Sequence, residues 1–122
     1  MDNTQFFYRT ATFTRANQQV GLADINNPKN IVPLDEWLGV VVSLADGHHT
    51  IQEMISFMSR QYQQTPENLE KTLHSVIERL VEENVIQLSN RVTTLPYYLA
   101  MPIEELDINK AKQLMIEDNY HF

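Results

Sequence analysis

The chain has 122 residues, no cysteine, and 16 acidic against 9 basic side chains, which gives a formal net charge of -7. A chain of this length can fold as one domain without disulfide bonds, and the lack of cysteine excludes iron–sulfur clusters, thiolate zinc sites and a cysteine nucleophile. The acidic balance argues against nonspecific nucleic-acid binding, which depends on lysine and arginine. With no signal peptide and no run of 18 apolar residues, we expect a cytoplasmic, non-enzymatic protein without a cofactor or a bound metal.

The charge is unevenly distributed along the chain. Residues 1–33 carry three basic and two acidic side chains, a net charge of +1, whereas residues 34–90 carry three basic and nine acidic ones, a net charge of -6. The last 22 residues hold five acids and two lysines. A binding partner would therefore meet a slightly basic N-terminal region and an acidic remainder.

The first third of the sequence predicts three strands. Residues 5–14 are rich in aromatic and β-branched side chains, with apolar residues at alternate positions and Arg9 as the exception on that face. A weaker strand is predicted over residues 19–25. Turn-forming residues at 26–30 then precede a short third strand at residues 31–32. A proline follows at once and removes a backbone donor, so we expect an edge strand.

The middle of the chain predicts three helices with distinct capping residues. Asp35 is the expected N-cap of the first, which ends at an aspartate–glycine turn. Thr50 and Glu53 match the capping box of a second helix that runs to about Tyr62. A long amphipathic stripe predicts the third helix over residues 65–84, ending at an asparagine that can adopt the left-handed conformation. An extended segment follows it.

The order of these elements and their residues resembles the PqqD-like family, also called the RiPP recognition element. The positions that carry the resemblance are Leu34, Asp35, Val41, Leu44, Asp46, Gly47, Thr50, Glu53, Met54, Tyr62, Val76, Leu80 and Val85. The departures from the family pattern are Asp35 for the usual asparagine, Trp37 for a small residue, Ala45 for a frequent cysteine and Asn84 for a terminal glycine. The resemblance covers about residues 5–88.

This resemblance implies an α+β fold of the winged helix-turn-helix type. An N-terminal three-stranded antiparallel sheet would precede a three-helix bundle in a domain of residues 1–90. Residues 91–122 would form a C-terminal helical extension. In this extension Tyr97, Tyr98 and Leu99 form an apolar segment, and Asp107 is the expected cap of a helix. The extension can pack on its own domain, dock a partner enzyme, or pair two protomers in a homodimer.

The resemblance also implies a function without catalysis. Family members bind the leader of a ribosomally synthesised precursor peptide by strand addition and present it to a modifying enzyme, commonly a radical S-adenosylmethionine (SAM) maturase. We expect the leader groove between the short edge strand and the third helix. The expected peptide-binding residues are Asn30, Ile31, Val32, Lys71, Leu73, Val76, Ile77 and Arg79.

Each of these assignments has an alternative. The apolar residues of the third helix can be core, and Lys71 and Arg79 can form ordinary ion pairs along the helix. Trp37 can be core or an exposed docking residue. The histidine pair at 48–49 can hold a metal with Glu53, although a turn is favoured because adjacent side chains point apart. The protein can also be a winged-helix interaction or regulatory subunit that binds no precursor peptide. The DNA-binding form of this alternative is disfavoured by the acidic third helix.

Overall fold

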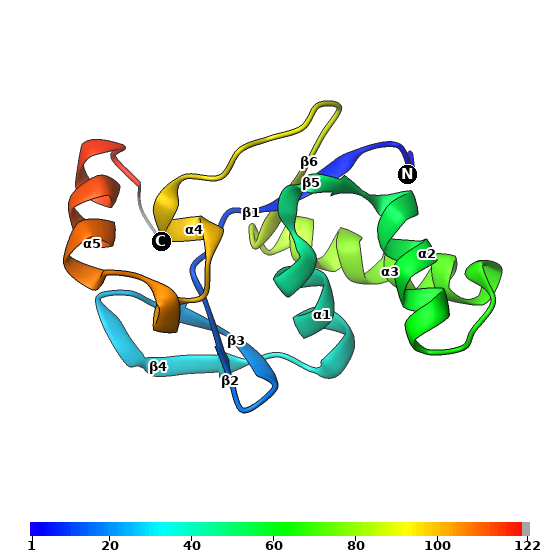
Figure 1. Ribbon diagram of the computed structural model, residues 1–122, viewed down its shortest axis with the longest axis horizontal. Coiled ribbons are helices and arrows are strands. Elements are labelled where there is room, and N and C mark those ends of the chain that lie inside the picture. Colours follow the sequence, from blue (N-terminus) through cyan, green and yellow to red (C-terminus); the bar gives the residue numbers. More distant parts are fainter. Residues whose placement is uncertain (121–122) are drawn as a thin grey trace.

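The computed structural model describes residues 1–120, which form an α+β fold with two three-stranded antiparallel sheets (Figure 1). Its strands are β1 (Phe6–Arg9), β2 (Phe13–Ala16), β3 (Gln19–Asp24), β4 (Asn27–Pro33), β5 (Asp46–Thr50) and β6 (Ile86–Ser89). Its helices are α1 (Glu36–Leu44), α2 (Ile51–Gln61), α3 (Pro66–Glu82), α4 (Tyr97–Ala100), the 3-10 turn η1 (Ile103–Glu105) and α5 (Ile108–Glu117). The predicted combination of an antiparallel sheet followed by helices is confirmed, and the second sheet was not predicted.

Strands β2, β3 and β4 form one sheet, here called the meander sheet, in the order β2-β3-β4. Asn17 and Gln18 join β2 to β3 with positive φ angles of 53° and 66°, as a two-residue hairpin turn requires. The sequence prediction of a turn over residues 26–30 is wrong. Residues 27–33 form β4, because the turn is tighter and lies at Ile25 and Asn26.

The other sheet has the order β5-β1-β6, with β1 at its centre. The prediction of a single strand over residues 5–14 is wrong, because the chain leaves this sheet after Arg9 and enters the meander sheet at Phe13. The aspartate–glycine turn expected after α1 instead begins β5. The extended segment expected after α3 pairs with β1 as β6.

The capping residues begin the helices where the sequence predicts. The backbone N–H of Leu38 donates to Asp35 at 2.9 Å, and Thr50 and Glu53 exchange the two hydrogen bonds of a capping box. Helix α3 begins after Thr65 with a proline in its first turn, and Asn84 follows its end with φ 60°. Within residues 1–120 no helix has both the length and the apolar character needed to cross a bilayer.

The meander sheet packs on a different apolar cluster on each face. Val20 and Leu22 of β3 face the main core, where α1 packs on the strand, and α1 in turn contacts α3. Ala23 and Ile25 face the other way, into a second cluster made with α4, η1 and α5. The C-terminal segment therefore covers one face of the sheet and the helical bundle covers the other.

Arg9 joins these two parts of the molecule. Its side chain is buried, with the residue 2% exposed, and it lies 4.5 Å from the ring centre of Phe13. The guanidinium donates hydrogen bonds of 2.9–3.2 Å to the backbone carbonyls of Val42, Ser43, Leu99 and Ala100. Burial lowers the pKa of Arg9 to about 10, so the side chain stays cationic at neutral pH. It therefore links β1 to the end of α1 and to α4.

Candidate functional site

Strand β4 is an open edge of the meander sheet. It pairs with β3 on one side, and all seven of its residues are exposed. Ile31 and Val32 are 48% and 56% exposed, which is unusual for large apolar side chains. Asn30 is also exposed on this strand. The structure thus places these three predicted binding residues side by side on a free edge.

The backbone groups of Ile31 point away from the sheet. Its partner on β3 is Ala23, whose N–H donates to the carbonyl of Thr12 at 3.3 Å and whose carbonyl accepts from the Thr12 hydroxyl. Both groups of Ala23 therefore turn toward β2, which makes Ala23 and Ile31 a non-hydrogen-bonded pair. It follows that the N–H and C=O of Ile31 both face outward, available to another strand.

Two prolines limit the length of this edge. Pro28 and Pro33 have no N–H to donate. The donors available to an added strand are therefore confined to the short stretch between them. Such an edge can accept a short strand while resisting extended pairing with other sheets.

A hollow lies on each face of the meander sheet near this edge. The smaller, of about 100 Å³, lies over Gly21 and is walled by residues that include Ile31 and Pro33. The larger, of about 540 Å³, lies between Leu22 and the turn after α3 at residues 83–85. Ile31 thus borders the smaller hollow, whereas the larger one is reached from β4 only through Leu22, the cross-strand partner of Val32.

The prediction that Leu73, Val76 and Ile77 form the floor of a groove between β4 and α3 is wrong. Leu73 and Ile77 are 0% exposed and Val76 is partly buried, because α1 and α2 pack on this face of α3. Lys71 and Arg79 lie exposed on α3, and Arg79 pairs with Glu83 at 3.4 Å. The residues that follow α3, 83–85, line the larger hollow together with Leu22 of the meander sheet.

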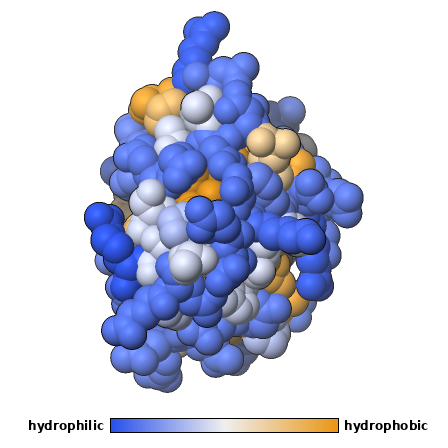
Figure 2. Space-filling model, turned by 90° about the vertical axis from the view of Figure 1, so that its right-hand side faces the viewer, coloured by the Kyte–Doolittle hydropathy of each residue, from blue (hydrophilic) through white to orange (hydrophobic). Residues whose placement is uncertain are grey.

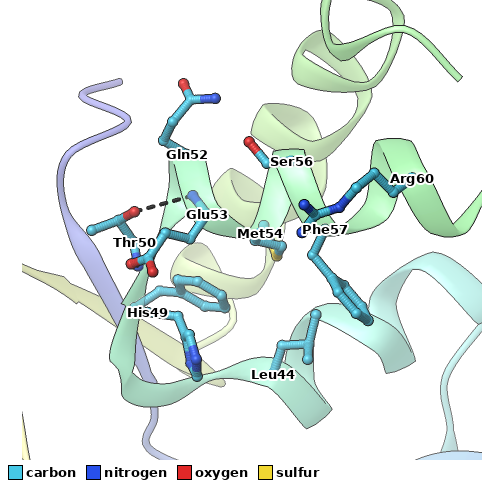
Figure 3. Close-up of a pocket in the computed structure, with 10 residues that line it drawn as sticks. Leu44, His49, Thr50, Gln52, Glu53, Met54, Ser56, Phe57 and Arg60 are labelled. Atoms are coloured by element: carbon cyan, nitrogen blue, oxygen red, sulfur yellow. Dashed lines mark hydrogen bonds between the residues drawn. The ribbon is translucent and has the colours of Figure 1, made fainter.

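A third hollow, here called the α2 hollow, lies on another part of the molecule (Figure 3). It has a volume of about 490 Å³ and lies between the end of α1, β5 and α2. The residues that line it are Phe7, Leu44, His49, Thr50, Gln52, Glu53, Met54, Ser56, Phe57 and Arg60. No sequence motif predicts this site. The one feature of the sequence that could have indicated this site is Phe57, an aromatic residue outside the buried stripe of α2.

The other candidate residues have structural roles. The Nδ1 atom of His49 lies 3.0 Å from Asp46, and the backbone N–H of His48 donates to the same carboxylate. Asp46 belongs to β5, and no group of three possible metal ligands occurs in residues 1–120. Trp37 is partly buried against the main core, with its ring centre 5.4 Å from that of Tyr62.

The chain was compared with known proteins at the level of sequence families, curated proteins and solved structures. None of the three comparisons gives a significant match. What the protein binds therefore has to be inferred from its own geometry.

Proposed function

We propose that this protein is a non-catalytic peptide chaperone whose β4 edge binds an extended peptide as a fourth strand of the meander sheet. The observation that carries the proposal is the open edge, with the backbone of Ile31 turned outward and two large apolar side chains exposed beside it. Strand addition derives affinity from main-chain hydrogen bonds and specificity from hollows that receive alternate side chains. The hollow beside Ile31, and the one beside Leu22, the partner of Val32, would supply that specificity.

The resemblance of residues 5–88 to PqqD-like proteins supports a more specific proposal. The peptide is then the leader of a ribosomally synthesised precursor. The partner is its modifying enzyme, for example a radical SAM maturase, and the domain is a winged helix-turn-helix. In this proposal the edge strand has the role that the resemblance implies, and residues 83–85, which follow α3, take the place of the contacts expected from α3 itself.

The chemistry of β4 favours a peptide with apolar and acidic residues. Lys29 is the one charged side chain on the strand, and it is exposed. Apolar side chains of the peptide would cover Ile31 and Val32, and a carboxylate would lie next to Lys29. The rest of the molecule is acidic, so an acidic peptide would be directed to this edge.

The test is a titration with the peptide encoded by a short reading frame beside the gene, followed by backbone amide shifts. The decisive variant is Ile31→Pro, which removes the outward donor. It leaves the β3–β4 hydrogen bonds in place, because the N–H of Ile31 takes no part in them. Its matched control is Ile31→Ala, which removes the side chain and keeps the donor.

We expect saturable shifts at residues 29–34 and at least a roughly tenfold loss of affinity in Ile31→Pro beyond that in Ile31→Ala, since about 1.4 kcal/mol corresponds to a factor of ten. Circular dichroism would confirm that both variants fold. Equal affinities of the two variants, or saturable shifts that avoid β4, would show that strand addition is not the binding mode. The absence of saturable binding would count against a leader-binding function.

A further inference from the structure

Helix α2 has two stripes of side chains with different environments. Ile51, Met54, Ile55 and Met58 are at most 2% exposed and form the buried stripe. The second stripe has the spacing i, i+3, i+4, i+7 and lines the α2 hollow; its members are Glu53, Ser56, Phe57 and Arg60. Glu53, Ser56 and Arg60 are polar, as expected on the solvent face of a surface helix, whereas Phe57 is a large exposed aromatic residue and calls for another explanation.

The floor of the α2 hollow is apolar and partly open to solvent. Phe7 is fully buried beneath it, whereas Phe57 is 44% exposed at its rim. Figure 3 shows Phe57 from α2 and Leu44 from α1 on the same side of the hollow, with His49 at its far end. The hollow therefore offers an apolar surface that a large side chain could cover.

The two charges on the rim are not equivalent. The carboxylate of Glu53 accepts the backbone N–H of Thr50 at 2.9 Å in the capping box, and hydrogen bonding to Thr50 lowers the pKa of Glu53. Arg60 has no ion pair or side-chain hydrogen bond with any residue in the range 1–120. Figure 3 shows it extending back along α2 toward Phe57. The unpaired cation stands out in a helical region of net charge -6.

The spacing of these groups restricts the ligand. Arg60 and Phe57 are three residues apart, about 5 Å along the helix axis. A ligand that contacts both side chains needs a carboxylate close to an apolar group, and the C-terminal residue of a polypeptide carries the two on one Cα atom. The side chains of Gln52 and Ser56 line the same wall and make no hydrogen bonds within residues 1–120, so they can pair with the backbone that precedes such a residue.

We propose that the α2 hollow is a second binding site, which receives the C-terminal residue of a partner polypeptide. The apolar side chain of that residue lies on Phe57, Leu44 and Met54, and its carboxylate pairs with Arg60. The site is separate from β4, since β4 and α2 lie at opposite ends of the view in Figure 1. It does not depend on the function proposed for the β4 edge.

The test uses three probes on the full-length protein, with methyl and backbone amide shifts as the readout. The first is the tripeptide acetyl-Ala-Ala-Phe with a free carboxylate, the second is the same peptide as an amide, and the third is N-acetyl-phenylalanine. The protein variant is Arg60→Gln, which keeps the stem and removes the charge. The control variant is Arg79→Gln, an exposed arginine on α3 outside the hollow.

We expect the free-acid tripeptide to shift Leu44, Met54 and residues 56–60 in a saturable way. The amide probe and the Arg60→Gln variant should each weaken binding about five- to tenfold, as for the loss of a charge-assisted hydrogen bond. Combining the amide with Arg60→Gln should weaken it no further, and Arg79→Gln should have no effect.

Three results would overturn the proposal. The first is no saturable shift at about 10 mM tripeptide, which would place any dissociation constant far above the millimolar range. The second is equal binding of acid and amide, or of wild type and Arg60→Gln. The third is N-acetyl-phenylalanine binding as tightly as the tripeptide, which would identify a free small acid as the ligand.

Discussion

The two edges of the meander sheet differ in how they are covered. The β2 edge is covered by the C-terminal segment, where Glu104 accepts hydrogen bonds from the hydroxyl of Thr14 and the backbone N–H of Arg15. Within residues 1–120 the β4 edge has no such cover, and it exposes Ile31 and Val32. An open edge can pair with another chain, and this contrast between the two edges is the basis of the proposed strand addition at β4.

The largest effect on stability is expected at Arg9, which donates hydrogen bonds to carbonyls of the C-terminal segment that covers the β2 edge. Arg9→Met would leave the carbonyls of Val42 and Leu99 buried without their donor, so we expect a loss of about 3 kcal/mol or more in the free energy of unfolding. Urea denaturation measures it. Arg15→Met is the matched control, because Arg15 forms only an exposed ion pair with Glu105 and should cost less than about 1 kcal/mol. Equal losses would mean that Arg9 does not join the two parts.

The next effect concerns the attachment of β4 to β3. A Cβ atom placed on Gly21 would lie 2.9 Å from both the Cγ2 of Ile31 and the carbonyl oxygen of Val32, so Gly21→Ala must displace β4. We expect a loss of about 1–3 kcal/mol, as in other overpacked sites, again measured by denaturation. Gly39→Ala is the control, because the gain in helix propensity of about 1 kcal/mol offsets its closer contact with Val20. A Gly21→Ala variant with the same free energy of unfolding as the wild type would contradict the tight β3–β4 pairing.

A smaller effect is expected at the covered edge. Glu104→Ala removes the acceptor for Thr14 and for the N–H of Arg15, and we expect a loss of about 1 kcal/mol because the site is partly exposed. Hydrogen exchange should show faster exchange of the Arg15 amide. Glu105→Ala removes only the surface ion pair and should leave that amide unchanged. If both variants behave alike, Glu104 does not cover the edge.

The smallest effect is a pH dependence at the same place. Partial burial raises the pKa of Glu104, but the hydrogen bonds from Thr14 and Arg15 lower it by more, so the net pKa lies below its usual value. Its contribution to stability is therefore complete above the unfolded-state pKa and is lost as the pH falls through the lower folded-state pKa. Below about pH 4.5 the difference in stability between wild type and Glu104→Ala should shrink. A difference that stays constant over this range would contradict the assigned hydrogen bonds.

The sequence predicted the elements whose determinants are local. Asp35, Thr50 and Asn84 mark helix ends through bonds or conformations within a few residues, and these boundaries are confirmed. The strand over residues 5–14 was not divided correctly, because Thr10 and Thr12 bond to Asn84 and Ala23, far away in the chain. Strand propensity is a property of single residues and does not predict such long-range pairing.

The candidate site was predicted only in part for a similar reason. The short edge strand could be inferred because proline marks it locally. Helical periodicity identified Leu73 and Ile77 as one apolar face, but it could not show that α1 and α2, rather than a peptide, cover that face. Arg9 was visible as the exception on an apolar face, although its carbonyl partners could be known only from the fold.

Hydrogen exchange at two neighbouring amides of β4 tests the central claim most directly. In the free protein the amide of Ile31, which faces outward, should exchange fast, and that of Val32, which faces β3, should exchange slowly. Saturating peptide from the neighbouring reading frame should slow the exchange of Ile31 markedly and leave Val32 little changed. An Ile31 amide that is already protected in the free protein, or that stays unprotected in the complex, would contradict strand addition at β4.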